Sequence, residues 1–168
     1  QIKKYCVASY GDLMSFRAVM LSEKDRQVSS SMVDLEDADL PQGDVLVSVD
    51  YSTLNYKDGM VLSGIGRLVR NYPHIPGIDF SGIVEASHDP RFASGDRVVL
   101  TGWKVGELHW GGFAEKARVN ADWLVKLPEN LSNLDAMAIG TAGLTSMLAM
   151  QALEEHGIKQ GPVLVTGA

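Results

Sequence analysis

The first residues able to do chemistry lie in a polar and aromatic stretch at residues 54–60, LNYKDGM. The stretch directly follows a regular strand pattern, and site residues often occur where a rigid strand ends. Its hydrogen-bonding groups include the amide of Asn55, the phenol of Tyr56 and the carboxylate of Asp58. Asp58 could pair with Asp79, but Asp79 lies in an apolar strand. A buried carboxylate that accepts backbone hydrogen bonds is therefore the favoured interpretation of Asp79.

Metal and nucleophile chemistry find little support in the sequence. The four histidines lie in three separate loops and at one helix end, and none has a second ligand at a recognised metal spacing: His74, His88, His109 and His156. Only His109, in the glycine-rich loop at residues 102–112, is a candidate site residue, and a loop hydrogen-bonder is its favoured alternative. There is no Gly-x-Ser-x-Gly elbow, and the single cysteine, Cys6, is interpreted as an incidental thiol.

A nucleotide site is the third chemistry to consider, because the chain ends on a strand-like run followed by a glycine. Residues 162–165, PVLV, are uniformly apolar, as expected for a parallel strand buried on both faces. Gly167 and Ala168 would then begin a phosphate-cradling loop. The glycine alone leaves two alternatives open, a nucleotide site and a buried core strand that turns.

The elements that must position these residues are β-rich at first. Short strands separated by turn signals are expected at residues 16–21, 27–35, 44–53, 78–85, 96–101, 113–119 and 123–127. Along residues 44–53 the pattern alternates, with Val45, Val47, Val49 and Tyr51 on one face. The spacing predicts a compact, antiparallel, barrel-like domain.

The period changes after Pro128. Residues 132–135, SNLD, fit a capping box that opens a short helix at 133–138. The glycines of GTAG at 140–143 interrupt this helix, a second helix follows, and Gly157 is expected to stop it as a left-handed cap. The order is therefore a β-rich domain and then the helix and strand of an α/β unit.

Composition bounds the possible functions. The 168 residues are 45% hydrophobic and 21% charged, with a net charge of −6 and no basic run, which disfavours nucleic-acid binding. No apolar run is judged to approach the length of a membrane span. One cysteine fits a reducing, cytoplasmic setting. Residues 1–13 precede Met14, which could be a natural start, and are left out of the fold prediction.

Five motifs occur in the order found in medium-chain dehydrogenases/reductases. They are LNYKD at 54–58, IPGIDFSG at 75–82, GDRV at 95–98, GGFAE at 111–115 and GTAGLT at 140–145. The chain resembles the zinc-free, quinone-oxidoreductase-like branch of that superfamily. Residues 70–80, 89–92 and 101–112 resemble its acryloyl-CoA reductase subgroup most closely.

The resemblance implies an α+β to α/β fold in which a GroES-like catalytic domain, residues 14–135, precedes a truncated Rossmann domain that binds NADPH, residues 136–168. Residues 1–13 fall outside it. Ile78, at a position where zinc-dependent members carry a ligand, cannot bind a metal. The resemblance implies a protein about twice as long, which dimerises through its Rossmann sheets. Residues 1–168 alone would be inactive, because most of the cofactor site would be missing. Without its neighbours, residues 140–168 would be poorly ordered or would aggregate.

The implied reaction is NADPH-dependent, zinc-independent reduction of the activated C=C of a short enoyl-CoA, acryloyl-CoA to propanoyl-CoA, by hydride transfer. Two alternatives stay open. One is reduction of a quinone or an enone, and the other is a non-catalytic GroES-like module if the chain is naturally this short. The partner is then a small acyl-CoA or enone, with no nucleic acid and no membrane.

The resemblance also assigns roles in the cleft between the two domains. Asn55 and Tyr56 would line the nicotinamide and substrate cleft, and Tyr56 would donate a hydrogen bond to the nicotinamide ribose or the substrate carbonyl. The alternative for Tyr56 is an aromatic side chain packed beneath the cleft. Asp58 would anchor the turn. Thr141 would contact the nicotinamide, with Gly140 allowing close backbone approach.

Two further roles follow from the same resemblance. Gly167 and Ala168 would begin the pyrophosphate loop. Arg70 would meet the phosphates of coenzyme A, with a plain surface arginine as the alternative. Arg70 and His109 are the two candidate substrate-binding residues.

Overall fold

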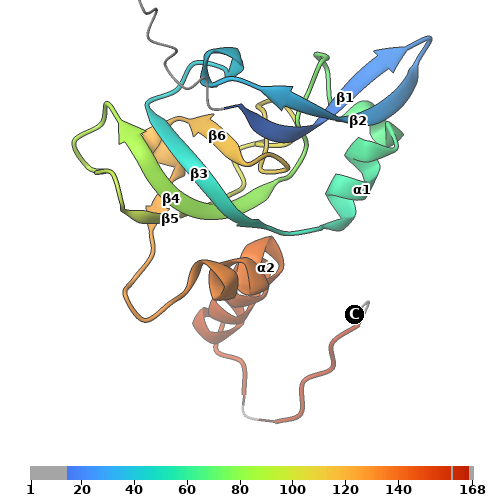
Figure 1. The fold of residues 1–168 in the computed structure, drawn as a ribbon. Coiled ribbons are helices and arrows are strands. Elements are labelled where there is room, and N and C mark those ends of the chain that lie inside the picture. The colour runs from blue at the N-terminus through green and yellow to red at the C-terminus, as the bar shows by residue number, and fades with distance from the viewer. Residues whose placement is uncertain (1–14, 160, 167–168) are drawn as a thin grey trace, which may run out of the picture.

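The computed structural model describes residues 15–159 and 161–166, and it contains two antiparallel sheets and two α-helices (Figure 1). Strands β1 (Phe16–Lys24) and β2 (Gln27–Leu35) form a hairpin. The second sheet has the order β6-β3-β4-β5-β7 and consists of β3 (Val45–Ser52), β4 (Asp79–Ser87), β5 (Arg97–Thr101), β6 (Lys116–Val119) and β7 (Val125–Lys126). Short 3-10 turns occupy η1 (Asp37–Asp39), η2 (Ile65–Arg67) and η3 (Ala121–Trp123). The antiparallel β-rich domain predicted from the sequence is confirmed.

The core forms where the alternating strands turn their apolar face inward. Val45 and Val47 of β3 are fully buried against residues of β4, β5 and β6, among them Phe80 and Leu100. The predicted face of β3 holds only in part. Tyr51 is 44% exposed, because a register shift between Val49 and Tyr51 interrupts the pairing with β4.

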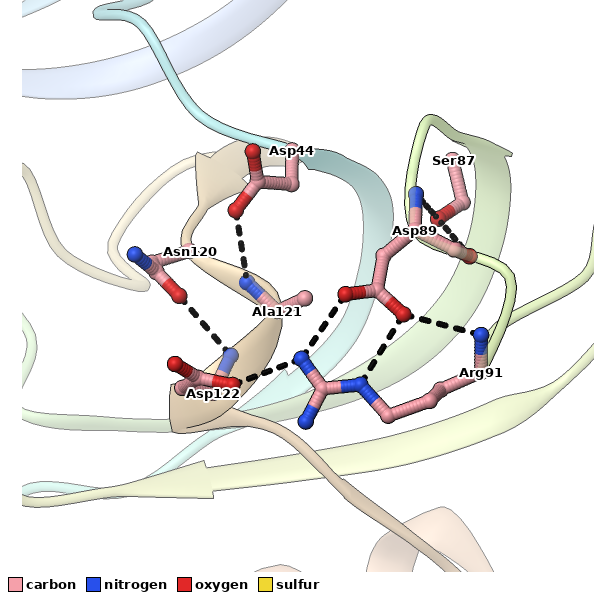
Figure 2. Close-up of polar contacts among 7 residues, drawn as sticks. All are labelled: Asp44, Ser87, Asp89, Arg91, Asn120, Ala121 and Asp122. Carbon is pink, nitrogen blue, oxygen red and sulfur yellow. Dashed lines mark hydrogen bonds and ion pairs between the residues drawn. The ribbon is translucent and has the colours of Figure 1, made fainter.

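In the loop after β4, Arg91 forms an ion pair with Asp89 of the same loop and a second one with Asp122 of η3 (Figure 2). The guanidinium of Arg91 donates to both carboxylate oxygens of Asp89, at 2.9 and 2.8 Å, and to Asp122 at 2.6 Å. These hydrogen bonds lower the pKa of Asp89 to about 2. Asp44 accepts from the backbone N–H of Ala121 at 3.2 Å, so the same turn is also held to the start of β3.

Helix α2 (Asn133–Glu155) begins and ends at the predicted signals. Its N-cap, Ser132, accepts from the backbone N–H of Asp135 at 3.0 Å. At its other end Gly157 has φ 80°, and the N–H of Ile158 reaches the carbonyl of Leu153 at 3.1 Å, as in a Schellman motif. The predicted interruption is a single residue, Gly140, with φ 49° and ψ −159°.

The two parts of α2 have different environments. The residues buried in α2 all lie at or before Gly140, where the helix meets the five-stranded sheet: Asn133, Ala136, Met137 and Gly140. After the break, large apolar side chains such as Leu144 and Met147 are exposed. In Figure 1, α2 lies below β3 and β4, and the β1–β2 hairpin lies above them.

By length and composition alone, α2 could cross a bilayer, so the sequence-based judgement that no apolar run approaches that length is wrong. The break at Gly140 divides the helix, however. Residues 141–155 span about 22 Å at about 1.5 Å per residue, which is short of the hydrocarbon core of about 30 Å.

The strand predicted at residues 162–165 is not formed. Val163, Leu164 and Val165 are 58%, 87% and 74% exposed, and residues 162–166 carry no regular secondary structure. A parallel strand needs neighbours to pair its N–H and C=O groups, and no strand pairs with this segment within the described residues. Of the helix and strand predicted for an α/β unit, only the helix is formed within the described residues.

Candidate active site

Asn55 lies three residues after the end of β3 and directly before helix α1 (Tyr56–Leu62). It is the N-cap of α1 in a capping-box arrangement with Asp58, and its backbone N–H donates to Asp58 at 2.8 Å. Its amide nitrogen donates to Thr53 Oγ1 at 2.7 Å and to Asp79 Oδ2 at 3.1 Å. Because both amide hydrogens are used in this way, Asn55 has a fixed orientation at the start of the helix.

Asp58 has the anchoring position predicted for it. Its side chain is fully buried, and its second oxygen accepts from the backbone N–H of Ile78 at 3.0 Å. Burial raises the pKa of this carboxyl above its ordinary value, against the lowering effect of the hydrogen bonds from Asn55 and Ile78. Asp58 thus joins the first turn of α1 to the segment before β4.

The buried carboxylate of Asp79 is the centre of the site. Its Oδ2 accepts from Thr53 Oγ1 at 2.9 Å, from the Asn55 amide and from the backbone N–H of Thr141 at 2.9 Å, and its Oδ1 accepts from the Thr141 hydroxyl. The interpretation of Asp79 as a buried acceptor is confirmed, but three of its four donors are side chains. Asp79 therefore connects the end of β3, β4 and α2.

Gly140 allows this connection. A Cβ at this position would lie 3.2 Å from Asp79 Oδ2 and 3.2 Å from Thr53 Cγ2. Its φ of 49° and ψ of −159° fall in a region that glycine alone adopts readily. The family resemblance implies that Gly140 and Thr141 lie at the nicotinamide. The structure shows that both also fit around Asp79, and their contact with a cofactor stays a prediction.

Tyr56 is the first residue of α1, and its side chain is 88% exposed. Within the described residues nothing covers its ring, and both its role as a hydrogen-bond donor and the alternative of an aromatic packed beneath the cleft stay predictions. Its ring borders a cavity of about 490 Å³, whose lining is mostly apolar and comprises Leu54, Asn55, Tyr56, Gly59, Met60, Ser63 and Ile65. An apolar hollow with one phenol and one amide at its edge is typical of a small-molecule site.

The remaining candidates lie elsewhere. His109 borders a separate cavity of about 650 Å³, and its ring centroid lies 4.6 Å from that of Trp123. Arg70 borders a third cavity of about 330 Å³ beside the β1–β2 turn. The structure does not bring either residue into the cavity of Tyr56, so their substrate contacts stay predictions. Gly167, Ala168 and Cys6 lie outside the described residues.

The donor set around Asp79 does not suit a metal ion. Both oxygens of Asp79 accept hydrogen bonds from protein groups, the amide nitrogen of Asn55 points toward them, and the neighbouring residue, Ile78, is aliphatic. Within residues 15–159 and 161–166, no group of three or more His, Cys, Asp or Glu side chains is arranged to hold a metal.

Sequence reasoning missed the role of Thr53 and underestimated Asp79. Thr53 lies at the end of an alternating strand and has no motif of its own. The available signal was the presence of both GIDFSG and GTAG in one chain, since Gly140, the first glycine of the second motif, leaves room for the aspartate of the first.

Comparison with known proteins gives relatives over most of the chain. Residues 41–129 match the model of the alcohol dehydrogenase GroES-like domain. The acrylyl-CoA reductase AcuI of Ruegeria pomeroyi is 58% identical over 148 residues, which are 87% of this chain and 45% of the relative. A quinone oxidoreductase of Sus scrofa is 37% identical over 127 residues, covering 74% of this chain and 36% of the relative.

Solved structures agree with the fold. The yhdH oxidoreductase of Salmonella enterica, crystallised in complex with NADP, superposes with a TM-score of 0.83 at 55% sequence identity, over 85% of this chain and 44% of that protein. The chain thus spans about half the length of the relatives and structures that it matches at this level of identity.

Proposed function

The chain belongs to the alcohol dehydrogenase GroES-like domain family, and from this premise we propose that it forms the substrate-binding part of an NADPH-dependent enoyl-CoA reductase. The single observation that carries the proposal is the exposed phenol of Tyr56 at the edge of a mostly apolar cavity, next to the hydrogen-bonded group around Asp79. The names of the relatives, acrylyl-CoA reductase and an NADP-bound oxidoreductase, supply the substrate and cofactor classes.

The proposed domain boundary falls in the first turn of α2, a few residues before the break at Gly140. Residues 14–135 would be the catalytic domain, and residues 136–168 the start of the cofactor domain. The whole protein would act as a cytoplasmic homodimer of subunits about twice this length. Support for the division comes from Gly140, where the helix leaves the sheet.

In the proposed reaction, acryloyl-CoA is reduced to propanoyl-CoA. NADPH, when bound, would supply the hydride to the β-carbon, and a proton from the solvent would add at the α-carbon. The side chains of Leu54, Met60 and Ile65 would enclose the short acyl group and exclude water from it. As negative charge develops on the thioester carbonyl oxygen, Tyr56 would stabilise it by donating a hydrogen bond from its hydroxyl.

Asn55 and Thr141 act in this proposal as positioning residues, since Asp79 holds the side chains of both. The reaction is proposed to be independent of zinc, because charge stabilisation comes from hydrogen-bond donors and the donor set at Asp79 does not suit a metal. Gly140 would bring the backbone close to the nicotinamide. Gly167 and Ala168 would hold the pyrophosphate.

The test is NADPH oxidation by the intact gene product. We expect oxidation that depends on acryloyl-CoA and persists after treatment with a chelator. Tyr56→Phe should lower kcat/KM by about tenfold to a hundredfold, the effect of removing one hydrogen bond to developing charge. Tyr51→Phe, at another exposed tyrosine that does not line the cavity, should be neutral.

Three results would overturn the proposal. Turnover of a quinone without turnover of acryloyl-CoA would assign the protein to the quinone reductases. Loss of activity with the chelator, restored by zinc, would refute the metal-free reaction. No NADPH oxidation with either substrate would favour a non-catalytic GroES-like module.

A further inference from the structure

The seven arginines of the chain fall into two groups. In four of them the guanidinium donates to a protein oxygen: Arg17 to Glu115, Arg91 to Asp89 and Asp122, Arg97 to the carbonyls of 128, 129 and 131, and Arg118 to that of Leu40. The guanidinium groups of Arg26, Arg67 and Arg70 have no such partner among residues 15–159 and 161–166.

These three arginines border the same cavity. It has a volume of about 330 Å³ and lies between the turn of the β1–β2 hairpin and the segment that follows α1. Glu23 is the one acidic side chain of the lining, and Tyr72 adds a hydroxyl. Three guanidinium groups and one carboxylate leave a local charge of +2 in a chain whose net charge is −6.

Two of the arginines stand on backbone that arginine rarely adopts. Asp25 and Arg26 form the two-residue turn of the hairpin with φ of 52° and 64°, which is type I′ geometry, where glycine is favoured at the second position. Arg67 has φ 48° in η2. Side chains at positive φ are disfavoured, and such positions concentrate at ligand sites.

The base of the cavity is rigid. Leu21, Val61 and Val69 form a buried cluster beneath it, and Tyr72 packs against this cluster. Gly64 lies so close to β2 that a Cβ there would approach Val28 Cγ2 to 2.6 Å. The hairpin and the segment after α1 are therefore held together, and the three guanidinium groups are presented from fixed elements.

We propose that the cavity lined by Arg26, Arg67 and Arg70 binds the phosphate or diphosphate group of a phosphate ester. Guanidinium groups pair with phosphate oxygens in bidentate geometry, and three of them match the charge of a diphosphate with Glu23 present. The hydroxyl of Tyr72 adds a neutral donor. The volume fits the phosphate part of a ligand and leaves the rest of it outside the cavity.

Two sources share this chemistry. One is the diphosphate of the coenzyme A carrier, and this assignment rests on the proposed function. The other is a free phosphorylated metabolite, and this assignment does not depend on the proposed function. The phosphate site itself is independent of the reductase proposal, because it can be titrated without NADPH and without turnover.

The experiment is calorimetric titration of the intact gene product with inorganic pyrophosphate, in the presence of saturating NADP⁺ so that the cofactor site is filled. We expect saturable binding that weakens as salt rises from about 50 to about 500 mM, because the cavity is open to solvent. Pyrophosphate binding that disappears when NADP⁺ is added would overturn the proposal, because it would place the anion in the cofactor site.

The variants separate binding from folding. Arg26→Gly and Arg67→Gly each put a glycine at a position of positive φ, where glycine is favoured, so Tm should not fall. Each variant should raise the Kd for pyrophosphate about tenfold. Arg70→Gln should have a similar effect. Lys24→Gln is the matched control, because it removes a positive charge beside the turn from a residue that does not line the cavity.

The proposal is wrong if the three arginine variants change the Kd by less than about twofold, or if Lys24→Gln weakens binding as much as they do. The source follows from steady-state kinetics. A parallel rise in KM for the acyl-CoA with constant kcat would identify the carrier. An unchanged KM would identify a free phosphorylated ligand, and absence of all turnover would refute the reductase while leaving the titration valid.

Discussion

Replacing glycines with alanine tests the geometry at Gly140 most directly. In Gly140→Ala an alanine must adopt the backbone angles φ 49° and ψ −159°, which costs about 1–3 kcal/mol. It must also push Asp79 Oδ2 and Thr53 Cγ2 away by a few tenths of an ångström. Asp79 Oδ2 accepts from Thr141 N at 2.9 Å, so the shift also costs part of a charge-assisted hydrogen bond of about 1.5–3 kcal/mol.

Against this, alanine lowers the entropy of the unfolded chain, which returns about 0.4–1 kcal/mol. The net expected loss in the free energy of unfolding is about 2–4 kcal/mol. Two controls separate the causes. Gly157→Ala has φ 80° with no atom within 4 Å of the new Cβ and should cost about 1 kcal/mol. Gly59→Ala, inside α1 and also without neighbours, should stabilise by about 0.4–1 kcal/mol.

The assay is urea unfolding of the three variants, followed by circular dichroism and tryptophan fluorescence. The predicted order of stability is Gly59→Ala above the parent, then Gly157→Ala, then Gly140→Ala. If Gly140→Ala unfolds at the same urea concentration as Gly157→Ala, Asp79 and Thr53 do not crowd Gly140. The role given to Gly140 would then be refuted.

Three further predictions concern single polar groups. Asp58→Asn should lower the free energy of unfolding by about 2 kcal/mol, because its NH₂ group would face one of the two backbone N–H groups that donate to Asp58. In urea unfolding, a loss no larger than that of exposed Asp34→Asn would contradict this prediction. Ser132→Ala should cost about 1 kcal/mol by removing the N-cap of α2, and an unchanged midpoint in the same assay would refute the cap. The carboxyl of Asp89 should titrate by NMR near its lowered pKa of about 2, and a midpoint near 3.8 would show that Arg91 does not hold it.

The sign of the last effect follows from linkage. The folded pKa of Asp89 lies below its ordinary value of 3.8, so its pairing with Arg91 stabilises the fold at any pH above about 4. As the pH falls through about 2, the folded state also binds the proton and this contribution disappears. Asp89→Asn should therefore be less stable than the parent at pH 5 and as stable as the parent near pH 1.

Local patterns were enough to predict most of the β-rich domain, because strand alternation and turn residues act over a few positions. The hairpin β1–β2, strand β3 and the cap at Ser132 are examples. The site was predictable only as separate pieces. Asn55 and Thr141 were assigned by resemblance, but their common attachment to Asp79 joins residues up to 86 positions apart, which no local pattern encodes.

Two features could not be decided from composition, for a different physical reason. Tyr56 was left open between a hydrogen-bond donor and an aromatic packed beneath the cleft, because its environment depends on the elements that surround the start of α1. Residues 162–165 have the composition of a buried strand, yet a strand forms only where another strand accepts its hydrogen bonds. In both cases the property belongs to the surroundings of the residue, and composition describes only the residue.

The carboxylate of Asp79 determines how the β-rich domain directs the helix that follows it. After the break at Gly140, Thr141 begins a new helical run, and its free backbone N–H is satisfied by Asp79 from β4. A negative charge at the N-terminus of a helix is also favoured by the helix dipole. The direction of residues 141–155 is therefore set by a buried acid of the sheet, while their apolar side chains contribute little to the sheet's core. Because Asp79 also holds Asn55, next to Tyr56, a change in the angle of this helix would move the edge of the candidate active site.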